Sequence, residues 1–199
     1  MDELTAQQEI TFIKKVMQDS RKIVFYDGKD FIYWGIIVVI CLLFTYFSVF
    51  FHTEKFIFYF WLILILLGFL GNSLFLKKRY KKLKVRSLAG KLLGLIWTAT
   101  AIAMIIVGFV GPFSGAFNGV FVSPLMCTFL GPAYLLSGYL YGKKWISYLS
   151  IFWWAGAIVM FFLPGLYTLL LMAGMMVVLQ IVPGIILYKD SKLEFAENI

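Results

Sequence analysis

Few residues of this chain carry groups that could do acid, base or nucleophilic chemistry. The single histidine, His52, stands near Glu54 and Lys55 in a short polar stretch between two apolar segments. One histidine with one carboxylate falls short of the three or four ligands that a zinc site uses. No serine, histidine and acid occur in a pattern typical of nucleophilic catalysis. The sequence therefore predicts no enzyme, no cofactor, no metal site and no catalytic residue.

Uncharged polar residues and prolines within the apolar segments are the next candidates. Asn72 and Gln180 carry the amides that are hardest to hide in apolar surroundings, and we expect them at a shared depth. Pro132 and Pro183 each adjoin a glycine, and a proline removes a backbone donor and kinks a helix. Broken helices mark substrate sites in some transporters. These four residues form a candidate substrate path, with packing kinks and interhelical hydrogen bonds as the alternative interpretation.

The elements that must position these residues are membrane-spanning helices. The chain is 62% hydrophobic and 14% charged, against about 45–50% and about 25% in soluble domains. A helix needs about 20 apolar residues to cross a bilayer. The predicted spans are Phe31–Phe50, Phe56–Leu76, Leu92–Phe113, Val120–Tyr141, Trp145–Leu163 and Leu166–Tyr188. The predicted fold class is all-α, an integral membrane bundle of six transmembrane helices. Its two halves of three spans have opposite orientations, but no residue correspondence between them is found.

Basic residues predict the orientation of this bundle. Six spans place 17 of the 18 lysines and arginines on one side of the membrane, and only Lys55 on the other. Loops rich in lysine and arginine stay in the cytoplasm, so both termini are expected there. We expect a cytoplasmic amphipathic helix and turn in residues 1–30, the transmembrane domain in residues 31–188, and a cytoplasmic tail in residues 189–199. The expected location is a bacterial inner (cytoplasmic) membrane.

An amphipathic helix is predicted before the first span, over residues 5–24. Its apolar side includes Ile10, Ile13 and Met17, which recur at spacings of three and four residues. Three interpretations stay open for this helix. It lies on the inner leaflet, it docks on the bundle or pairs with a second copy to form a homo-oligomer, or it binds a separate cytoplasmic or membrane protein.

A basic cluster follows the second span. Its members are Lys77, Lys78, Arg79, Lys81, Lys82, Lys84 and Arg86. The simplest interpretation is a determinant of topology, and such a cluster also attracts anionic lipid by about 1 kcal/mol for each basic residue. Nucleic acid is not expected as a partner, since Tyr80 is the lone aromatic residue here and no recognition module surrounds it.

Several apolar motifs carry a resemblance. They are Phe31-Ile32-Tyr33-Trp34-Gly35 after Ser20-Arg21-Lys22, Trp153-Trp154, Leu163-Pro164-Gly165, and the run from Ile181 to Tyr188. With them the whole chain resembles a group of small bacterial six-span membrane proteins that have an amphipathic helix at the N-terminus. That group has no established activity, so the resemblance implies no functional residue.

Three functions are compatible with these features. The leading hypothesis is a non-enzymatic membrane protein with a regulatory or scaffolding role. The second is a small transporter or channel for an apolar or amphipathic substrate, which would use the candidate path. The third is a subunit of a membrane-bound lipid or redox enzyme that takes its chemistry from a partner.

Overall fold

The computed structural model describes residues 28–82 and 88–196, and in this part of the chain all regular elements are helices. Six helices are long and apolar enough to cross a membrane. They are Lys29–Phe50, Glu54–Leu74, Leu88–Phe113, Gly119–Tyr141, Lys144–Phe162 and Tyr167–Leu193. The predicted fold class is confirmed, and each observed span overlaps its predicted counterpart.

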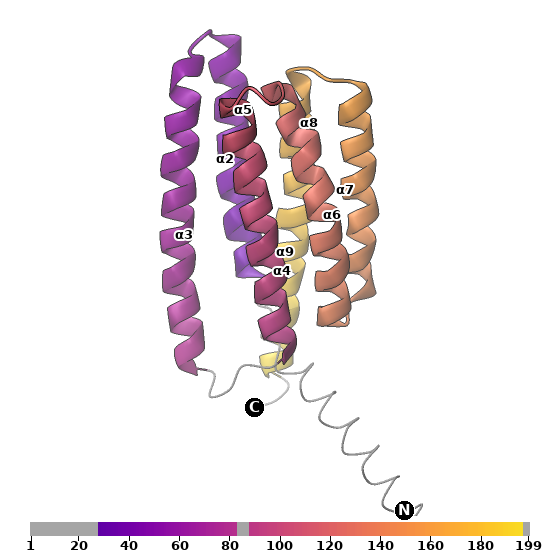
Figure 1. The fold of residues 1–199 in the computed structure, drawn as a ribbon. Helices are drawn as coiled ribbons and strands as arrows, with labels where there is room; N and C mark the ends of the chain where they lie inside the picture. Colours follow the sequence, from indigo (N-terminus) through magenta and orange to yellow (C-terminus); the bar gives the residue numbers. More distant parts are fainter. Residues whose placement is uncertain (1–27, 83–87, 197–199) are drawn as a thin grey trace, which may run out of the picture.

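The elements follow one another up and down the bundle (Figure 1). In chain order they are α2 (Lys29–Phe50), η1 (Glu54–Phe56), α3 (Ile57–Lys82), α4 (Leu88–Ile105), η2 (Ile106–Val110), α5 (Gly111–Phe113), η3 (Gly119–Phe121), α6 (Val122–Tyr141), α7 (Lys144–Phe162), α8 (Tyr167–Met176), η4 (Val177–Ile181) and α9 (Val182–Ala196). The start of α2 and the end of α9 lie at the same end of the bundle.

Two helices extend beyond the predicted spans. The helix α3 continues to Lys82, so five members of the basic cluster belong to a helix rather than to a loop. Lysine and arginine are good helix formers, which explains how a helix can leave the membrane without ending. In the same way α9 continues to Ala196 and includes much of the predicted tail.

The two halves of the chain pack by the same rule. In the first half, α2 packs against α3, the second helix of its own half, and against α8, η4 and α9, the third span of the other half. In the second half, α6 packs against α7 and against α4 and η2, which belong to the third span of the first half. Each half therefore contributes its third span to the other.

Both third spans change from α-helix to π-helix shortly before a proline. The π-helices η2 and η4 each have five residues and end two residues before Pro112 and Pro183 respectively. A proline cannot donate to the carbonyl four residues earlier, and its ring clashes with that carbonyl. Those carbonyls belong to Gly108 and Leu179, the middle residues of the two π-helices. The wider turn, which bonds residue i to residue i+5, therefore lies where the proline disrupts the α-helical ladder.

The most extensive contact between two described helices joins α6 and α7. A Cβ atom at Gly138 would lie 2.3 Å from the backbone nitrogen of Ser147, and one at Gly131 would lie 2.0 Å from the indole nitrogen of Trp154. The Ser147 hydroxyl also donates to the carbonyl of Leu135 at 3.0 Å. Small residues let membrane helices approach closely, and these glycines permit the α6–α7 contact.

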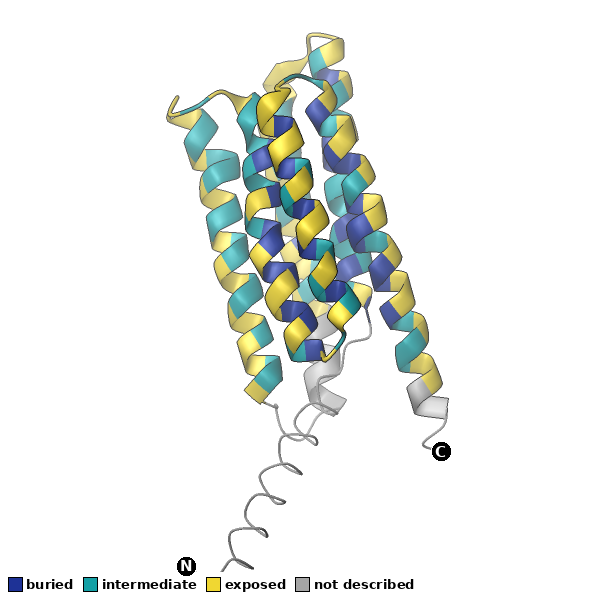
Figure 2. Cartoon of the chain, turned by 90° about the vertical axis from the view of Figure 1, so that its right-hand side faces the viewer, coloured by how far each residue is buried: buried dark blue, intermediate teal, exposed yellow. Residues whose placement is uncertain are grey.

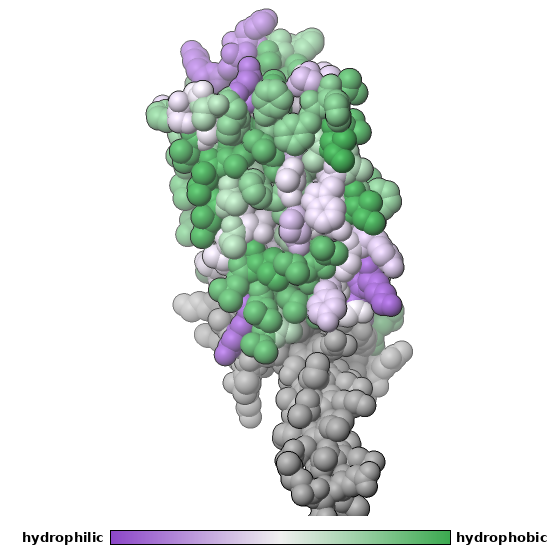
Figure 3. All heavy atoms as spheres, turned by 45° about the vertical axis from the view of Figure 1, so that its right-hand side comes forward, coloured by the Kyte–Doolittle hydropathy of each residue, from purple (hydrophilic) through white to green (hydrophobic). Residues whose placement is uncertain are grey.

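Burial is unevenly shared among the spans. Buried positions follow the sides of the helices that face one another, and exposed positions cover the outward sides (Figure 2). In an apolar stretch of 18 residues from each span, 39% of the residues are buried in Gly119–Tyr141 and in Tyr167–Leu193. The same share is 6% in the span that includes α3 and 0% in the span that begins with α4. The visible flank of the molecule is mostly hydrophobic, with hydrophilic residues toward its ends (Figure 3). The bundle thus has a packed core and two peripheral spans.

Candidate functional site: a buried amide and aromatic cluster

The Gln180 side chain joins three spans inside the bundle. It lies on η4 and only 4% of its surface is exposed. The Tyr134 hydroxyl on α6 donates to Gln180 Oε1 at 3.2 Å, and Gln180 Nε2 donates to the carbonyl of Phe31 on α2 at 3.4 Å. Both ends of the amide are therefore engaged by protein groups. Tyr134 and the Phe31 carbonyl are partners that the sequence analysis missed.

Four aromatic rings surround this hydrogen-bonded group. Phe31, Trp97 and Tyr134 contact one another edge to face, with ring centroids 5.5, 5.6 and 5.9 Å apart. The Trp153 ring lies 5.6 Å from Tyr134 at a tilt of 46°. Such edge-to-face pairs add about 0.5–1.5 kcal/mol beyond the area that they bury. We call Phe31, Trp97, Tyr134, Trp153 and Gln180 the amide–aromatic cluster.

The two indole N–H groups of this cluster differ in their partners. Trp97 donates to the Ser137 hydroxyl on α6 at 3.1 Å. Trp153 is fully buried, and no acceptor among the described residues bonds to its indole nitrogen. A buried donor without an acceptor costs about 1–3 kcal/mol. The cluster can therefore donate one further hydrogen bond, from Trp153.

The two predicted prolines occupy different surroundings. Pro183 is buried in α9, three residues after Gln180, and follows the π-helix that carries this glutamine. Pro132 lies inside α6 and is exposed on the outside of the bundle. Pro183 is therefore buried next to the segment that carries Gln180, whereas Pro132 faces outward.

Asn72 lies on α3, which packs against the face of α2 that is turned away from Gln180. Gly35 and Phe31 of α2 contact the Gln180 segment. Tyr33, on the other hand, donates to the carbonyl of Leu67 on α3 at 3.2 Å and lies against Gly71. Residues of a helix are about 100° apart, so Tyr33 lies roughly half a turn from Phe31 and Gly35. Asn72 and Gln180 are thus near the same end of α2 but on opposite sides of it.

The Asn72 side chain has an unsatisfied atom of its own. Its Oδ1 is buried and accepts no hydrogen bond from residues 28–82 or 88–196, although the residue as a whole is partly exposed. An amide of this kind within a membrane span usually pairs with a neighbouring helix. In this chain the helix packed closest to α3 is α2, and it supplies no donor to Asn72.

An apolar groove lies on the surface between α7 and α8, apart from the cluster. It has a volume of about 400 Å³, and its lining includes Phe152, Leu170, Gly174, Met175 and Leu179. Because this surface belongs to two membrane spans, lipid chains can fill the groove. No polar group in it would orient a ligand, so the amide–aromatic cluster remains the candidate functional site.

Several predicted residues lie where their side chains are not described. Ile10, Ile13 and Met17 fall outside the described residues, as do Lys84 and Arg86. The helical backbone of α3 includes Lys77, Lys78, Arg79, Lys81 and Lys82. Their roles in docking and in lipid contact stay predictions.

The chemistry available in the amide–aromatic cluster is neutral hydrogen bonding. The phenol of Tyr134 donates to the amide of Gln180, and the Trp97 indole donates to Ser137. The two cysteines of the chain, Cys41 and Cys127, are fully buried. Across the described ranges, no three side chains among histidine, cysteine, aspartate and glutamate lie close enough to hold a metal ion. In comparisons with known proteins, no family model, no curated protein and no solved structure matches the chain.

Proposed function

We propose that this chain is a non-enzymatic membrane protein that acts by binding another membrane protein, in a regulatory or scaffolding role. The supporting observation is how few residues of α3 and α4 are buried by the rest of the described chain. In the apolar 18-residue stretches of these two spans, 6% and 0% of the residues are buried. The other spans hold the buried residues of the core, and α4 reaches this core with the side chain of Trp97 while much of its surface stays uncovered. In this proposal α3 and α4 are the part of the molecule that a partner covers.

Apolar exposure alone does not favour a partner, because lipid chains are as apolar as leucine. The residue types on α4 add the specific argument. Gly94 and Thr98 lie one turn apart, and both are exposed. A Cβ atom at Gly94 would meet no atom of a described residue within 4 Å. Two small residues four apart allow the backbones of two membrane helices to approach closely. We call Gly94 and Thr98 the α4 docking face.

A photo-crosslinking amino acid at Ile102, one turn beyond the α4 docking face, tests this proposal in living cells. We expect an adduct of one defined mass, because a specific interface captures one partner. The substitution Gly94→Leu should abolish this adduct by preventing close approach. Gly174→Leu is the matched control, since Gly174 on α8 is also exposed and also has no neighbour within 4 Å. An adduct that survives Gly94→Leu, or no adduct at all, contradicts the proposal.

A second candidate function, transport of an apolar or amphipathic substrate, draws on a separate observation. The third spans of both halves are broken by a π-helix before a proline, and each packs against the first helix of the other half. Helices that are interrupted within the membrane form the binding sites of many transporters, and η4 lies near the middle of the span Tyr167–Leu193. Transport would require Gln180, whereas docking through α4 would not, so Gln180→Leu separates the two functions. The third alternative, an enzyme subunit, stays a prediction.

The cellular setting is part of the same proposal. The bias of 17 basic residues against one supports cytoplasmic termini. The resemblance to small bacterial membrane proteins supports a bacterial inner membrane. A homo-oligomer is one form of the proposed association, in which a second copy covers α3 and α4.

A further inference from the structure

The exchange of third spans between the halves divides the described bundle into two units. The α2 unit consists of α2, α3, α8, η4 and α9, and the α6 unit consists of α4, η2, α5, α6 and α7. Within each unit the helices pack extensively, whereas contact between the units is sparser and comes mainly from α6 and α7 against α8 and η4. The chain crosses from one unit to the other between α3 and α4 and again between α7 and α8.

Contacts that involve backbone atoms hold each unit together. In the α2 unit, a Cβ atom at Gly28 would lie 2.1 Å from the carbonyl oxygen of Gly184 and 2.8 Å from the backbone nitrogen of Tyr188. In the α6 unit, a Cβ atom at Gly138 would lie 2.3 Å from the backbone nitrogen of Ser147. Backbone atoms packed this closely cannot shift unless the whole helix shifts, because a close-packed interior transmits strain. Each unit therefore behaves as one rigid piece.

Side chains make the contacts across the boundary between the units. A Cβ atom at Gly156 on α7 would lie 2.3 Å from the Cε atom of Met175 on α8, and methionine adapts its shape easily. The Phe58 ring on α3 meets the Phe109 ring on η2, with centroids 5.7 Å apart. The apolar groove of about 400 Å³ between α7 and α8 lies on this same boundary. The boundary is thus packed less tightly than the interior of either unit.

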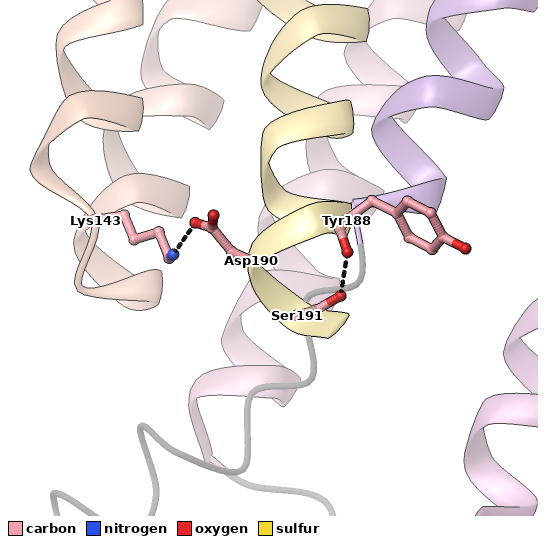
Figure 4. Close-up of polar contacts among 4 residues, drawn as sticks. All are labelled: Lys143, Tyr188, Asp190 and Ser191. Carbon is pink, nitrogen blue, oxygen red and sulfur yellow. Dashed lines mark hydrogen bonds and ion pairs between the residues drawn. The ribbon is translucent and has the colours of Figure 1, made fainter. Parts of the chain in front are cut away.

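Two polar contacts join the units toward the end of the bundle where α2 begins. Lys143, in the turn between α6 and α7, pairs with Asp190 on α9 at 2.6 Å. Figure 4 shows the Lys143 side chain reaching across to α9, while the Tyr188 ring points away from this ion pair. The hydrogen bond from Tyr134 to Gln180, at 3.2 Å, crosses the same boundary. Both contacts require the two units to be close together at this end.

The closed arrangement also leaves a donor unsatisfied beside this boundary. Trp153 on α7 contacts Tyr134, and no acceptor among the described residues bonds to its indole N–H. A buried donor without an acceptor costs free energy, and water that entered between separated units would recover it. The same interactions that close this end thus include one that favours opening.

We propose that the α2 unit and the α6 unit move against each other as rigid bodies and separate at the end where α2 begins. The Lys143–Asp190 ion pair and the Tyr134–Gln180 hydrogen bond form the latch that holds this end closed. Rigid-body movement of one repeat against another is how transporters built from inverted halves expose a central site. The motion needs no partner, so it does not rest on docking through α4.

Distances between two spin labels, measured by double electron–electron resonance on the full chain in nanodiscs, test this motion. The labels are attached to Tyr139→Cys on α6 and Ile186→Cys on α9, which are exposed positions in different units. The native cysteines are fully buried, so the new ones should label selectively. The control pair, Leu95→Cys and Tyr139→Cys, places both labels within the α6 unit, and its distance should stay constant.

The variant Tyr134→Phe/Asp190→Asn removes both contacts of the latch. Loss of a partly exposed ion pair shifts an equilibrium by up to about fivefold. An amide left unpaired in the closed state shifts it by about fivefold or more. We therefore expect the population with a longer distance between the units to rise roughly tenfold relative to the native chain.

A single distance between the units in both the native chain and the double variant overturns the proposal. An equal change in the control pair does so too, because the units would then not be rigid. Charge reversal, Lys143→Asp/Asp190→Lys, rebuilds the ion pair with opposite polarity. When it is combined with Tyr134→Phe, the longer-distance population should return to that of Tyr134→Phe alone. If that population stays at the level of the double variant, the ion pair is not part of the latch.

Discussion

Gln180 is a small group that connects distant parts of the chain. Its amide bonds to Tyr134 and to the carbonyl of Phe31, which is 149 residues away in the sequence. In the apolar interior of a membrane protein, an amide with both ends satisfied is a specific connector, because a wrong neighbour would leave it unpaired. The residue types allowed us to predict that Gln180 needs partners but not which residues those are.

The hydrogen bond between Tyr134 and Gln180 predicts a measurable coupling. Gln180→Leu and Tyr134→Phe should each lower the free energy of unfolding by about 1–3 kcal/mol, because each leaves a buried group unpaired. In a double-mutant cycle, the two changes should show a coupling of about 0.5–1.7 kcal/mol. The measurement is reversible unfolding in mixed micelles with dodecyl sulfate. Thr98→Val replaces Tyr134→Phe in the control cycle, since the Thr98 hydroxyl bonds within its own helix. Equal coupling in both cycles would contradict the proposed contact.

Other residues of the cluster gave no sequence signal. Tyr134 and Trp153 stand among many aromatic residues, and aromatic side chains in membrane helices face lipid as readily as protein. Asn72 carries an amide that is hard to hide in a span, and among the described residues none donates to its Oδ1. The difference between Asn72 and Gln180 depends on tertiary packing, which the identity of a single residue does not encode.

At the scale of elements, length and composition were sufficient to predict all six spans. The observed starts and ends differ from the predicted ones by a few residues, mainly where α3 and α9 continue past the membrane. Which face of each helix points inward could not be predicted. A helix in water shows its buried face by an apolar stripe, but helices that are apolar all round carry no such stripe. The prolines pointed to breaks in the helices, though not to π-helices.

The π-helix η4 should depend on Pro183. With Pro183→Ala, the Leu179 carbonyl regains an α-helical donor, so the π-helix is expected to relax to an α-helix and turn Gln180 away from Tyr134. The coupling between Tyr134 and Gln180 should then fall by at least half when the double-mutant cycle is repeated in this background. Pro132→Ala is the control, because Pro132 is exposed and α6 stays α-helical on both sides of it. An unchanged coupling in Pro183→Ala would show that the π-helix has another cause.

At the scale of the whole molecule, the chain has a packed core and two peripheral spans. This division was not predictable, since the apolar content of α3 and α4 matches that of the core spans. The third span of the second half is buried against α2, whereas the third span of the first half contacts α6 and keeps most of its surface uncovered. Orientation in the membrane, by contrast, was inferred from charge alone.

Two glycines provide a matched test of the orientation. Gly115 lies in the turn after α5 and Gly142 in the turn between α6 and α7, and Figure 1 shows these two turns at opposite ends of the bundle. Both glycines have positive φ, and a Cβ atom at either would lie more than 4 Å from every other described residue. The native cysteines are fully buried, so a new cysteine at either position should label selectively. In intact cells, a membrane-impermeant maleimide should label Gly115→Cys, and it should label Gly142→Cys only after permeabilisation. The reverse result would place the termini outside.

The contact between α2 and the last span also has a consequence for how the protein is made. The first helix enters the membrane early, yet its partner Gln180 is translated 149 residues after Phe31. At about 5–20 residues per second, that delay is roughly 7–30 s. During this interval α2 can pack against α3 but not against the last span. A chaperone or a membrane protease can then recognise the uncovered face of α2. If translation stops before Gln180, this face of α2 stays uncovered. Completion of the C-terminal span therefore decides whether α2 is protected from degradation.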